Sequence, residues 1–150
     1  MFAEINFTKS HPAAVTPFKG SKGAAAVDLV SVGVTYENGT FIVNTGLRTA
    51  FPEGFVLLVF GRSGFARKHG IHLANGVGVI DSDYRGDLQL MFRCEDPTVS
   101  TDDMFNLLAP GQRVAQAILM PLPVTDWVEV CELPDSVRGA GGFGSTGMGI

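Results

Sequence analysis

Short runs of apolar or alternating residues recur along the chain, separated by glycine, proline and asparagine. Side chains alternate between the two faces of a strand, so short runs bounded by turn residues favour β-strands over helices. Such runs occupy residues 3–9, 25–32, 39–50, 55–61, 76–80, 87–94, 112–123 and 126–133. The dipeptides Asn38-Gly39 and Asn75-Gly76 are typical of hairpin turns, and residues 52–54 predict a further turn. The pattern predicts an all-β sandwich, barrel or jelly roll.

One stretch, residues 63–70, carries the signals of a short helix. Ser63 can cap its first turn, and Gly70 can end it. Residues 102–108 are consistent with a second helix or with a loop insertion. We find neither an internal repeat nor an interdomain linker, so the length of 150 residues predicts one domain.

The composition narrows the class of protein. Hydrophobic residues make up 45% and charged residues 17% of the chain, which is typical of a soluble globular protein. The net charge of −4 provides no basic surface for nucleic acid, and the apolar runs are shorter than the roughly 20 residues that span a membrane. Cys94 and Cys131 lie far apart and form no disulfide framework. We therefore expect a cytoplasmic protein that binds neither nucleic acid nor membrane.

The chain ends in the glycine-rich segment RGAGGFGSTGMGI. Gly139, Gly141 and Gly144 match the spacing of a dinucleotide-binding turn, but that turn needs a following helix and an acidic residue about 20 positions on. The remaining chain holds neither. Two interpretations stay open: a disordered terminus, or a tail that orders over a ligand and contributes Arg138 and Phe143 to it.

Two internal segments combine charged residues with turn signals. In GRSGFARKHG, Arg62 and Ser63 lie at the predicted helix start, which suits either a phosphate site or an ordinary capped helix. In NGVGVIDSDYRGDL, Asp81 and Asp83 share a face if the backbone is extended, and could then hold a metal or orient a water. The alternative for this segment is a turn that caps its own backbone.

Three further features have ordinary structural explanations. His69 and His72 form H-x-x-H without a third ligand at metal spacing, so zinc is not expected. Gln116 is a polar residue in an apolar strand, as an outward-facing strand position would be. Trp127, the single tryptophan, predicts packing in the core or at an interface.

Five segments together resemble the homotrimeric dUTPases, the deoxyuridine 5'-triphosphate nucleotidohydrolases. In chain order they are AAAVDLVS, GRSGFARKHG, NGVGVIDSDYRGDL, GQRVAQAILMP and RGAGGFGSTG. The resemblance implies a jelly-roll-like β-clip barrel over residues 1–137, with one short helix. It also implies a mobile arm, residues 138–150, that closes over the active site. The implied assembly is a trimer with active sites at the subunit interfaces.

The resemblance implies Mg²⁺-dependent hydrolysis of dUTP to dUMP and pyrophosphate, which limits uracil in DNA and supplies dUMP for thymidylate synthesis. Asp81 would be the general base, and Asp28 would lie near Mg²⁺, joined to it through water. The base and sugar would be bound by Asn75, Gly78, Val79, Tyr84 and Phe143. The phosphates would be bound by Arg62, Ser63, Gly64, Gln116, Arg138, Ser145 and Thr146.

The chain departs from the family pattern in three places. Ala26 and Val27 replace a glycine and a bulky residue, and Gly61 replaces a proline. Residues 94–110 are longer than the commonest form, which predicts a surface loop or, over 94–108, a contact for a protein partner. Two alternatives to dUTP hydrolysis stay open: a dCTP deaminase of the same fold, and a regulatory module that binds protein.

Overall fold

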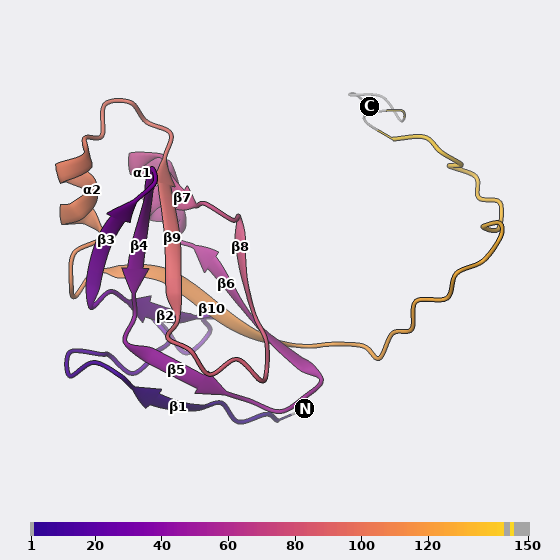
Figure 1. The fold of residues 1–150 in the computed structure, drawn as a ribbon, viewed down its shortest axis with the longest axis horizontal. Helices are drawn as coiled ribbons and strands as arrows, with labels where there is room; N and C mark the ends of the chain where they lie inside the picture. Colours follow the sequence, from indigo (N-terminus) through magenta and orange to yellow (C-terminus); the bar gives the residue numbers. More distant parts are fainter. Residues whose placement is uncertain (1, 143–144, 146–150) are drawn as a thin grey trace.

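The computed structural model describes residues 2–142 and 145. Two four-stranded antiparallel sheets pack face to face, and a two-stranded sheet lies at one end (Figure 1). The first sheet has the order β2-β10-β6-β8, with bounds Val27–Val30, Arg113–Pro121, Phe55–Gly61 and Val77–Ile80. The second has the order β3-β4-β9-β7, with bounds Gly33–Glu37, Thr40–Asn44, Gln89–Cys94 and Ile71–Leu73. Strands β1 (Asn6–Lys9) and β5 (Leu47–Ala50) form the third.

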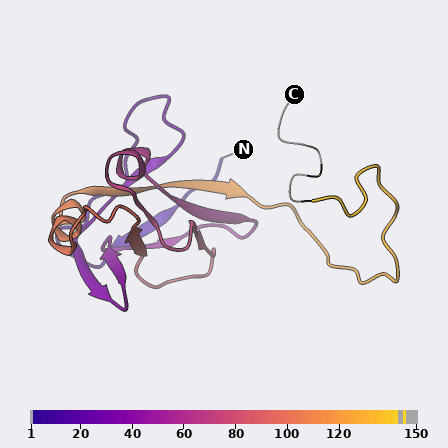
Figure 2. The same ribbon diagram turned by 90° about the horizontal axis from the view of Figure 1, so that it is seen from above.

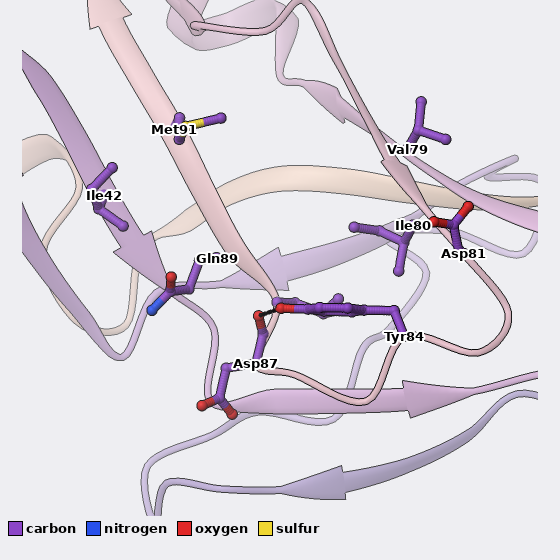
Figure 3. Close-up of a pocket in the computed structure, with 9 residues that line it drawn as sticks. Ile42, Val79, Ile80, Asp81, Tyr84, Asp87, Gln89 and Met91 are labelled. Carbon is purple, nitrogen blue, oxygen red and sulfur yellow. Dashed lines mark hydrogen bonds between the residues drawn. The ribbon is translucent and has the colours of Figure 1, made fainter.

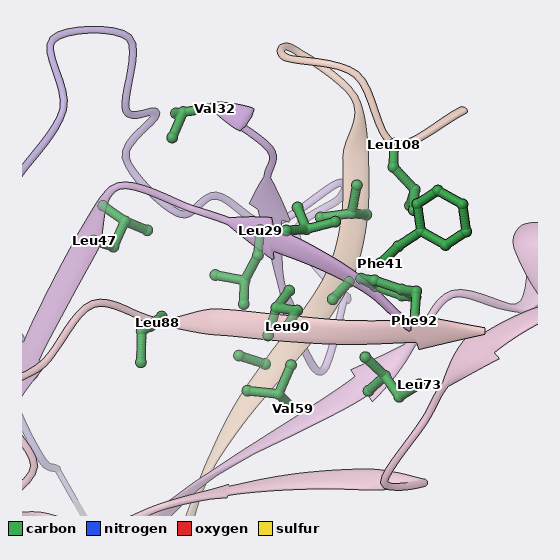
Figure 4. Close-up of a cluster of buried hydrophobic side chains, with 14 of the residues drawn as sticks. Leu29, Val32, Phe41, Leu47, Val59, Leu73, Leu88, Leu90, Phe92 and Leu108 are labelled. Atoms are coloured by element: carbon green, nitrogen blue, oxygen red, sulfur yellow. The ribbon is translucent and has the colours of Figure 1, made fainter. Parts of the chain in front are cut away.

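The core lies between the two four-stranded sheets. Leu29 and Val59 of the first sheet face Leu90 and Phe92 of the second, and all four side chains are buried (Figure 4). Alternate residues of β9 are buried and exposed, as expected for strands that cover a core on one face only. The all-β, jelly-roll-like prediction is confirmed.

The two predicted asparagine-glycine hairpins have different outcomes. Asn38 (φ 49°) and Gly39 (φ 78°) both adopt positive φ and join the paired strands β3 and β4, so this hairpin is confirmed. Gly76 also has a positive φ of 71°, but β7 pairs with β9 and β8 pairs with β6. The Asn75-Gly76 turn therefore carries the chain from one sheet to the other. The hairpin prediction was wrong there because strand pairing is decided by distant partners.

The structure contains two short helices in its described part, where the resemblance implied one. The first, α1 (Ser63–His69), ends at Gly70 in the left-handed conformation, as predicted. Ser63 does not cap it, because Arg62 occupies the N-cap position and Ser63 is the first helical residue. The second, α2 (Thr101–Leu107), begins with a capping box between Ser100 and Asp103.

Helix α2 accounts for about half of the long segment 94–108. Met104 on α2 and Leu108 just after it are buried in the core, so the helix is fixed to the sheet beneath it. The surface-loop interpretation holds for residues 95–100 and is corrected for 101–108, where apolar residues at helical spacing fold the chain back onto the body. Its suggested contact with a protein partner stays a prediction.

The predicted strand over residues 126–133 is absent from the structure. Beyond β10 the chain leaves the body as an extended segment (Figures 1 and 2). We call residues 122–137 the connecting segment. Its Trp127 is 99% exposed, and Val124 and Leu133 are exposed as well. A strand needs a hydrogen-bonded partner, and the described single chain provides none here, so Trp127 does not pack in the core of its own chain.

Candidate active site

Four of the five segments lie side by side across the first sheet. Gln116 on β10 stands opposite Asp28 on β2 and opposite Phe60 on β6, and Phe60 stands opposite Val77 on β8. Residues directly opposite each other in a sheet share a face. The row therefore places Asp28 and Gln116 on the outer face of the sheet, one residue from Gly61.

A cluster of polar side chains forms at the β2 side of this row. We call Asp28, Arg62, Arg113 and Gln116 the Asp28 cluster. The Arg113 Nη1 donates a hydrogen bond to Asp28 Oδ2 at 3.0 Å, and Arg62 Nε lies 3.5 Å from Asp28 Oδ1. Gln116 Nε2 donates to the Gly61 carbonyl at 3.1 Å. With two guanidinium groups around one carboxylate, the cluster carries a net positive charge that suits an anionic ligand.

A cavity of about 650 Å³ opens beside the Asp28 cluster. Its walls include Asp28, Gln116 and Gly61, and the backbone of the Ala-rich segment 24–26 closes another side. Ala26 replaces the expected glycine without blocking this space, since it lines the cavity. Ser63 and Gly64 occupy the first turn of α1, directly after Arg62. The structure thus brings together the predicted phosphate-binding residues of the body.

Asp81 lies at the other end of β8. The residues after β8 form a turn in which the Tyr84 N–H donates to the Asp81 carbonyl at 3.2 Å. The extended arrangement that would align Asp81 with Asp83 is therefore wrong, and the alternative of a turn is confirmed. Asp81, Val79 and Tyr84 line a cavity of about 360 Å³ (Figure 3). We call it the Tyr84 cavity.

The floor of the Tyr84 cavity is tied to the two-stranded sheet. The Tyr84 hydroxyl donates to the Asp87 carbonyl at 3.1 Å, and Arg48 Nε donates to Asp87 Oδ1 at 3.0 Å. The hydrogen bonds from Arg48 and from the Ser10 hydroxyl hold the pKa of Asp87 below its ordinary value. Asp87 thus remains a carboxylate that anchors the loop. Nothing local in the sequence indicated this pair, because its partners lie on segments far apart in the chain.

Strand β8 runs between Asn75 and Asp81. In the part of the chain that the structure describes, it is one of the two edge strands of its sheet, so half of its backbone groups point away from β6. Gly78 faces inward, where a Cβ would lie 3.1 Å from the Cβ of Val59, and Val79 faces outward with 63% exposure. The strand therefore presents unpaired backbone donors and acceptors between Asn75 and Asp81.

The C-terminal residues lie apart from both cavities. Arg138 bonds locally, its Nε donating to the Gly141 carbonyl at 2.8 Å, and the N–H of Ser145 donates to the Gly142 carbonyl. Neither Arg138 nor Ser145 is among the residues that line the two cavities, and the chain beyond β10 runs away from the body (Figure 2). Phe143 and Thr146 lie outside the described residues.

Comparisons with known proteins identify the family of the chain. The dUTPase family model matches residues 13–147. The deoxyuridine 5'-triphosphate nucleotidohydrolase of Wolinella succinogenes is 40% identical over 146 residues, covering 96% of this chain and 94% of the relative. The enzyme of the same name from Paramecium bursaria Chlorella virus 1 is 41% identical over 137 residues, covering 90% and 92%.

Solved structures show the same fold. The dUTPase of Staphylococcus bacteriophage 80alpha, determined with dUpNHpp, aligns with a TM-score of 0.78 at 24% identity, covering 97% of this chain and 99% of that one. A mutant dUTPase of phage phi11 of S. aureus, described with a structural Mg(II) ion, aligns with a TM-score of 0.73 at 18% identity, covering 88% and 99%. The fold and the order of these segments along the chain define the class: a nucleotide-binding all-β protein. The chain belongs to the dUTPase family.

The donor set can be tested against a magnesium ion. Among the described residues, no three His, Cys, Asp or Glu side chains are grouped so that they could hold a metal ion. As a separate finding, no described helix is long and apolar enough to cross a membrane. In nucleotide sites Mg²⁺ keeps several waters and is held by one or two carboxylates together with the substrate phosphates. The side chain of Asp28, 14% exposed beside the cavity, fits an ion that arrives with the triphosphate.

Proposed function

We propose that this protein hydrolyses dUTP to dUMP and pyrophosphate by attack of water on the α-phosphorus. The observation that carries the proposal is the family match over residues 13–147, in a fold that places a carboxylate beside a nucleoside-sized cavity. The reaction limits uracil in DNA and supplies dUMP for thymidylate synthesis. The two unpaired cysteines, Cys94 and Cys131, fit a protein that works in the reducing cytoplasm.

Asp81 acts as the general base in this proposal. A carboxylate accepts the proton of the attacking water as the new bond to phosphorus forms. Asp81 is well suited because it follows the end of β8, where a rigid strand and a closed turn fix its backbone. Asp28 would hold Mg²⁺ indirectly, through water, and the ion would screen the phosphate charge.

Recognition of the base and sugar is assigned to β8 and the Tyr84 cavity. Uracil offers an N3–H donor between two acceptors, whereas cytosine lacks that donor and would leave a backbone acceptor unpaired. The open backbone edge of β8 near Gly78 and Val79, with Asn75 at its start, supplies partners for the uracil pattern. Tyr84 packs beneath the sugar and leaves no room for a ribose 2'-hydroxyl.

The phosphates bind at the Asp28 cluster. Arg62 and Gln116 offer the N–H groups that they do not use in contacts within the Asp28 cluster. Ser63 contributes a hydroxyl, and Ser63 and Gly64 contribute backbone N–H groups. These donors stabilise the negative charge that develops on the leaving pyrophosphate. The positive charge of the cluster supports this assignment in a chain whose net charge is −4.

Two copies of the chain are needed to complete one site. Asp81 lies four residues beyond Val77, about 13 Å along the strand direction, and Gln116 lies two strands away, about 10 Å across the sheet. The Cα atoms of Asp81 and Gln116 in the same chain are thus about 16 Å apart by this geometry. The outer face between them carries exposed Val79 and Met120, which favours a partner chain packed there. We therefore propose a homotrimer with shared sites.

The C-terminal arm, residues 138–150, completes the site in this proposal. It follows a connecting segment long enough to leave its own body, and its glycines permit close approach to a ligand. Arg138, Ser145 and Thr146 then bind phosphate, and Phe143 stacks on uracil.

Product analysis tests the activity. The purified protein is incubated with Mg²⁺ and, separately, dUTP, dCTP, dTTP and UTP, and nucleotides, pyrophosphate and ammonia are measured. We expect dUMP and pyrophosphate from dUTP alone. Ammonia from dCTP would instead identify a deaminase, and the lack of any product would favour the protein-binding role, with residues 94–108 as its predicted contact.

A further inference from the structure

Arg113 is not among the site residues predicted from the sequence, yet it contacts two other members of the Asp28 cluster, Asp28 and Arg62. Its guanidinium bonds Asp28 Oδ2 at 3.0 Å, and its backbone carbonyl accepts a hydrogen bond from Arg62 Nη1 at 2.9 Å. A single residue thus contacts the carboxylate of one segment and the cation of another. The Arg113 side chain is 47% exposed, whereas that of Asp28 is only 14% exposed.

A β-bulge directs Arg113 to this position. The register between β10 and β2 shifts between Arg113 and Ala115, so Val114 is an extra residue in β10. In a regular strand, Arg113 would share the inward face of Ala115. Because of the extra residue, Val114 and Ala115 are both buried, and Arg113 lies on the outer face with Gln116. The bulge inserts one core residue and turns the arginine towards Asp28.

The charge balance explains what this contact does. Asp28 lies between two guanidinium groups, with the Arg113 contact at 3.0 Å and the Arg62 contact at 3.5 Å. If Arg113 lost its charge, Arg62 would be the one cation left beside this shielded carboxylate among the residues that the structure describes. Asp28 would then hold Arg62 more closely and withdraw it from a phosphate.

We propose that Arg113 is a positioning residue for the phosphate end of the site, fixing the Asp28 carboxylate so that Arg62 remains available to the triphosphate. The inference rests on the proposed assignment of phosphate binding to the Asp28 cluster. Arg113 itself need not touch the substrate, and its effect passes through Asp28 and Arg62.

The test compares Arg113→Met, which keeps the length and removes the charge, with Arg113→Lys, which keeps a cation. We expect Arg113→Met to lower kcat and the affinity for non-hydrolysable α,β-imido-dUTP by about tenfold. The affinity for dUMP, which lacks the β- and γ-phosphates, should stay within about twofold. Arg113→Lys should restore part of the loss. Arg93→Met, which removes an exposed arginine near α2, is the matched control and should change neither affinity.

The proposal would be overturned if Arg113→Met kept wild-type kinetics, or if it weakened dUMP and the imido analogue equally. Thermal melts establish that the variants fold, and Arg113→Gln replaces Arg113→Met should the latter not fold. Arg62→Ala tests the proposed phosphate site by itself. A fully active Arg62→Ala would remove Arg62 from phosphate binding. An impaired Arg62→Ala beside an unimpaired Arg113→Met would contradict the role of Arg113 alone.

Discussion

Gly86 lies directly against the ring of Tyr84. A Cβ placed on Gly86 would come 2.5 Å from Tyr84 Cζ and 2.9 Å from Cε2. Because the clash involves the end of a side chain, the ring can move aside, at the cost of its hydrogen bond to the Asp87 carbonyl. The absence of a Cβ at residue 86 thus leaves room for the Tyr84 ring, which lines the Tyr84 cavity.

Replacing Gly86 by alanine should therefore alter sugar recognition more than stability. We expect the KM for dUTP to rise by about tenfold and the discrimination against UTP to weaken, with little change in Tm. Steady-state kinetics on both nucleotides measures the effect. Gly33→Ala is the control, because a Cβ there meets no atom within 4 Å, and it should behave as the wild type. An unchanged preference for dUTP in Gly86→Ala would argue against Tyr84 as the sugar contact.

Asp81→Asn should remove the general base and retain the shape of the site. Turnover should fall by about 10³-fold, within the range for loss of a positioned base, while α,β-imido-dUTP binds as tightly as before. Asp83→Asn provides the comparison, since Asp83 lies in the same turn but outside the Tyr84 cavity. Turnover of Asp81→Asn near the wild-type rate would show that another group accepts the proton.

Two truncations should separate the roles of the C-terminal segments. Ending the chain after Val137 removes the arm and should abolish most turnover with the trimer intact. Ending it after Pro121 also removes the connecting segment and should dissociate the trimer. Val124, Trp127 and Leu133 of this segment are exposed on the described single chain, as expected for side chains that pack against another subunit. Light scattering reports the mass of each species. Dissociation already at Val137 would make the arm a structural element.

The pair between Arg48 and Asp87 should make stability depend on acid pH. The pKa of Asp87 is lower in the folded chain than its ordinary 3.8, chiefly through the hydrogen bond from Arg48. The pair therefore stabilises the fold above pH 3.8, and this stabilisation is lost as the pH falls through the folded pKa. Arg48→Met should lower Tm at pH 7, with the difference from wild type shrinking as the pH falls below 3.8. A difference independent of pH would assign the effect to packing.

Elements fixed by neighbouring residues could be predicted from the sequence, whereas those that depend on distant strands could not. Asn38-Gly39 was interpreted correctly because adjacent strands and two positive φ values settle that hairpin within a few residues. The same dipeptide at Asn75-Gly76 was misread because the partners of its flanking strands lie elsewhere in the chain. The capping box of Ser100 and Asp103 was present in the sequence and would have favoured α2 over a loop. Residues 126–133 alternate like a strand, but the described single chain contains no partner strand for them.

For the site too, which residues take part could be predicted, but where they lie relative to one another could not. The resemblance of the ordered segments to the dUTPases assigned roles to Asp28, Arg62, Asp81 and Gln116. Their separation at two ends of a sheet could not be predicted, since it follows from strand order and register. Arg113 was missed for a related reason: a regular strand would have turned it inward, and only the bulge places it beside Asp28.

The central claim is that each site combines Asp81 of one chain with the Asp28 cluster of another, and subunit mixing tests it most directly. Asp81→Asn and Arg62→Ala chains, each inactive alone, are refolded together in equal amounts and assayed with dUTP. In random trimers with shared sites, about one quarter of the sites combine an intact Asp81 with an intact Arg62. We therefore predict recovery of about a quarter of wild-type activity by the same symmetry argument. A mixture that forms mixed trimers yet stays inactive would contradict the shared site.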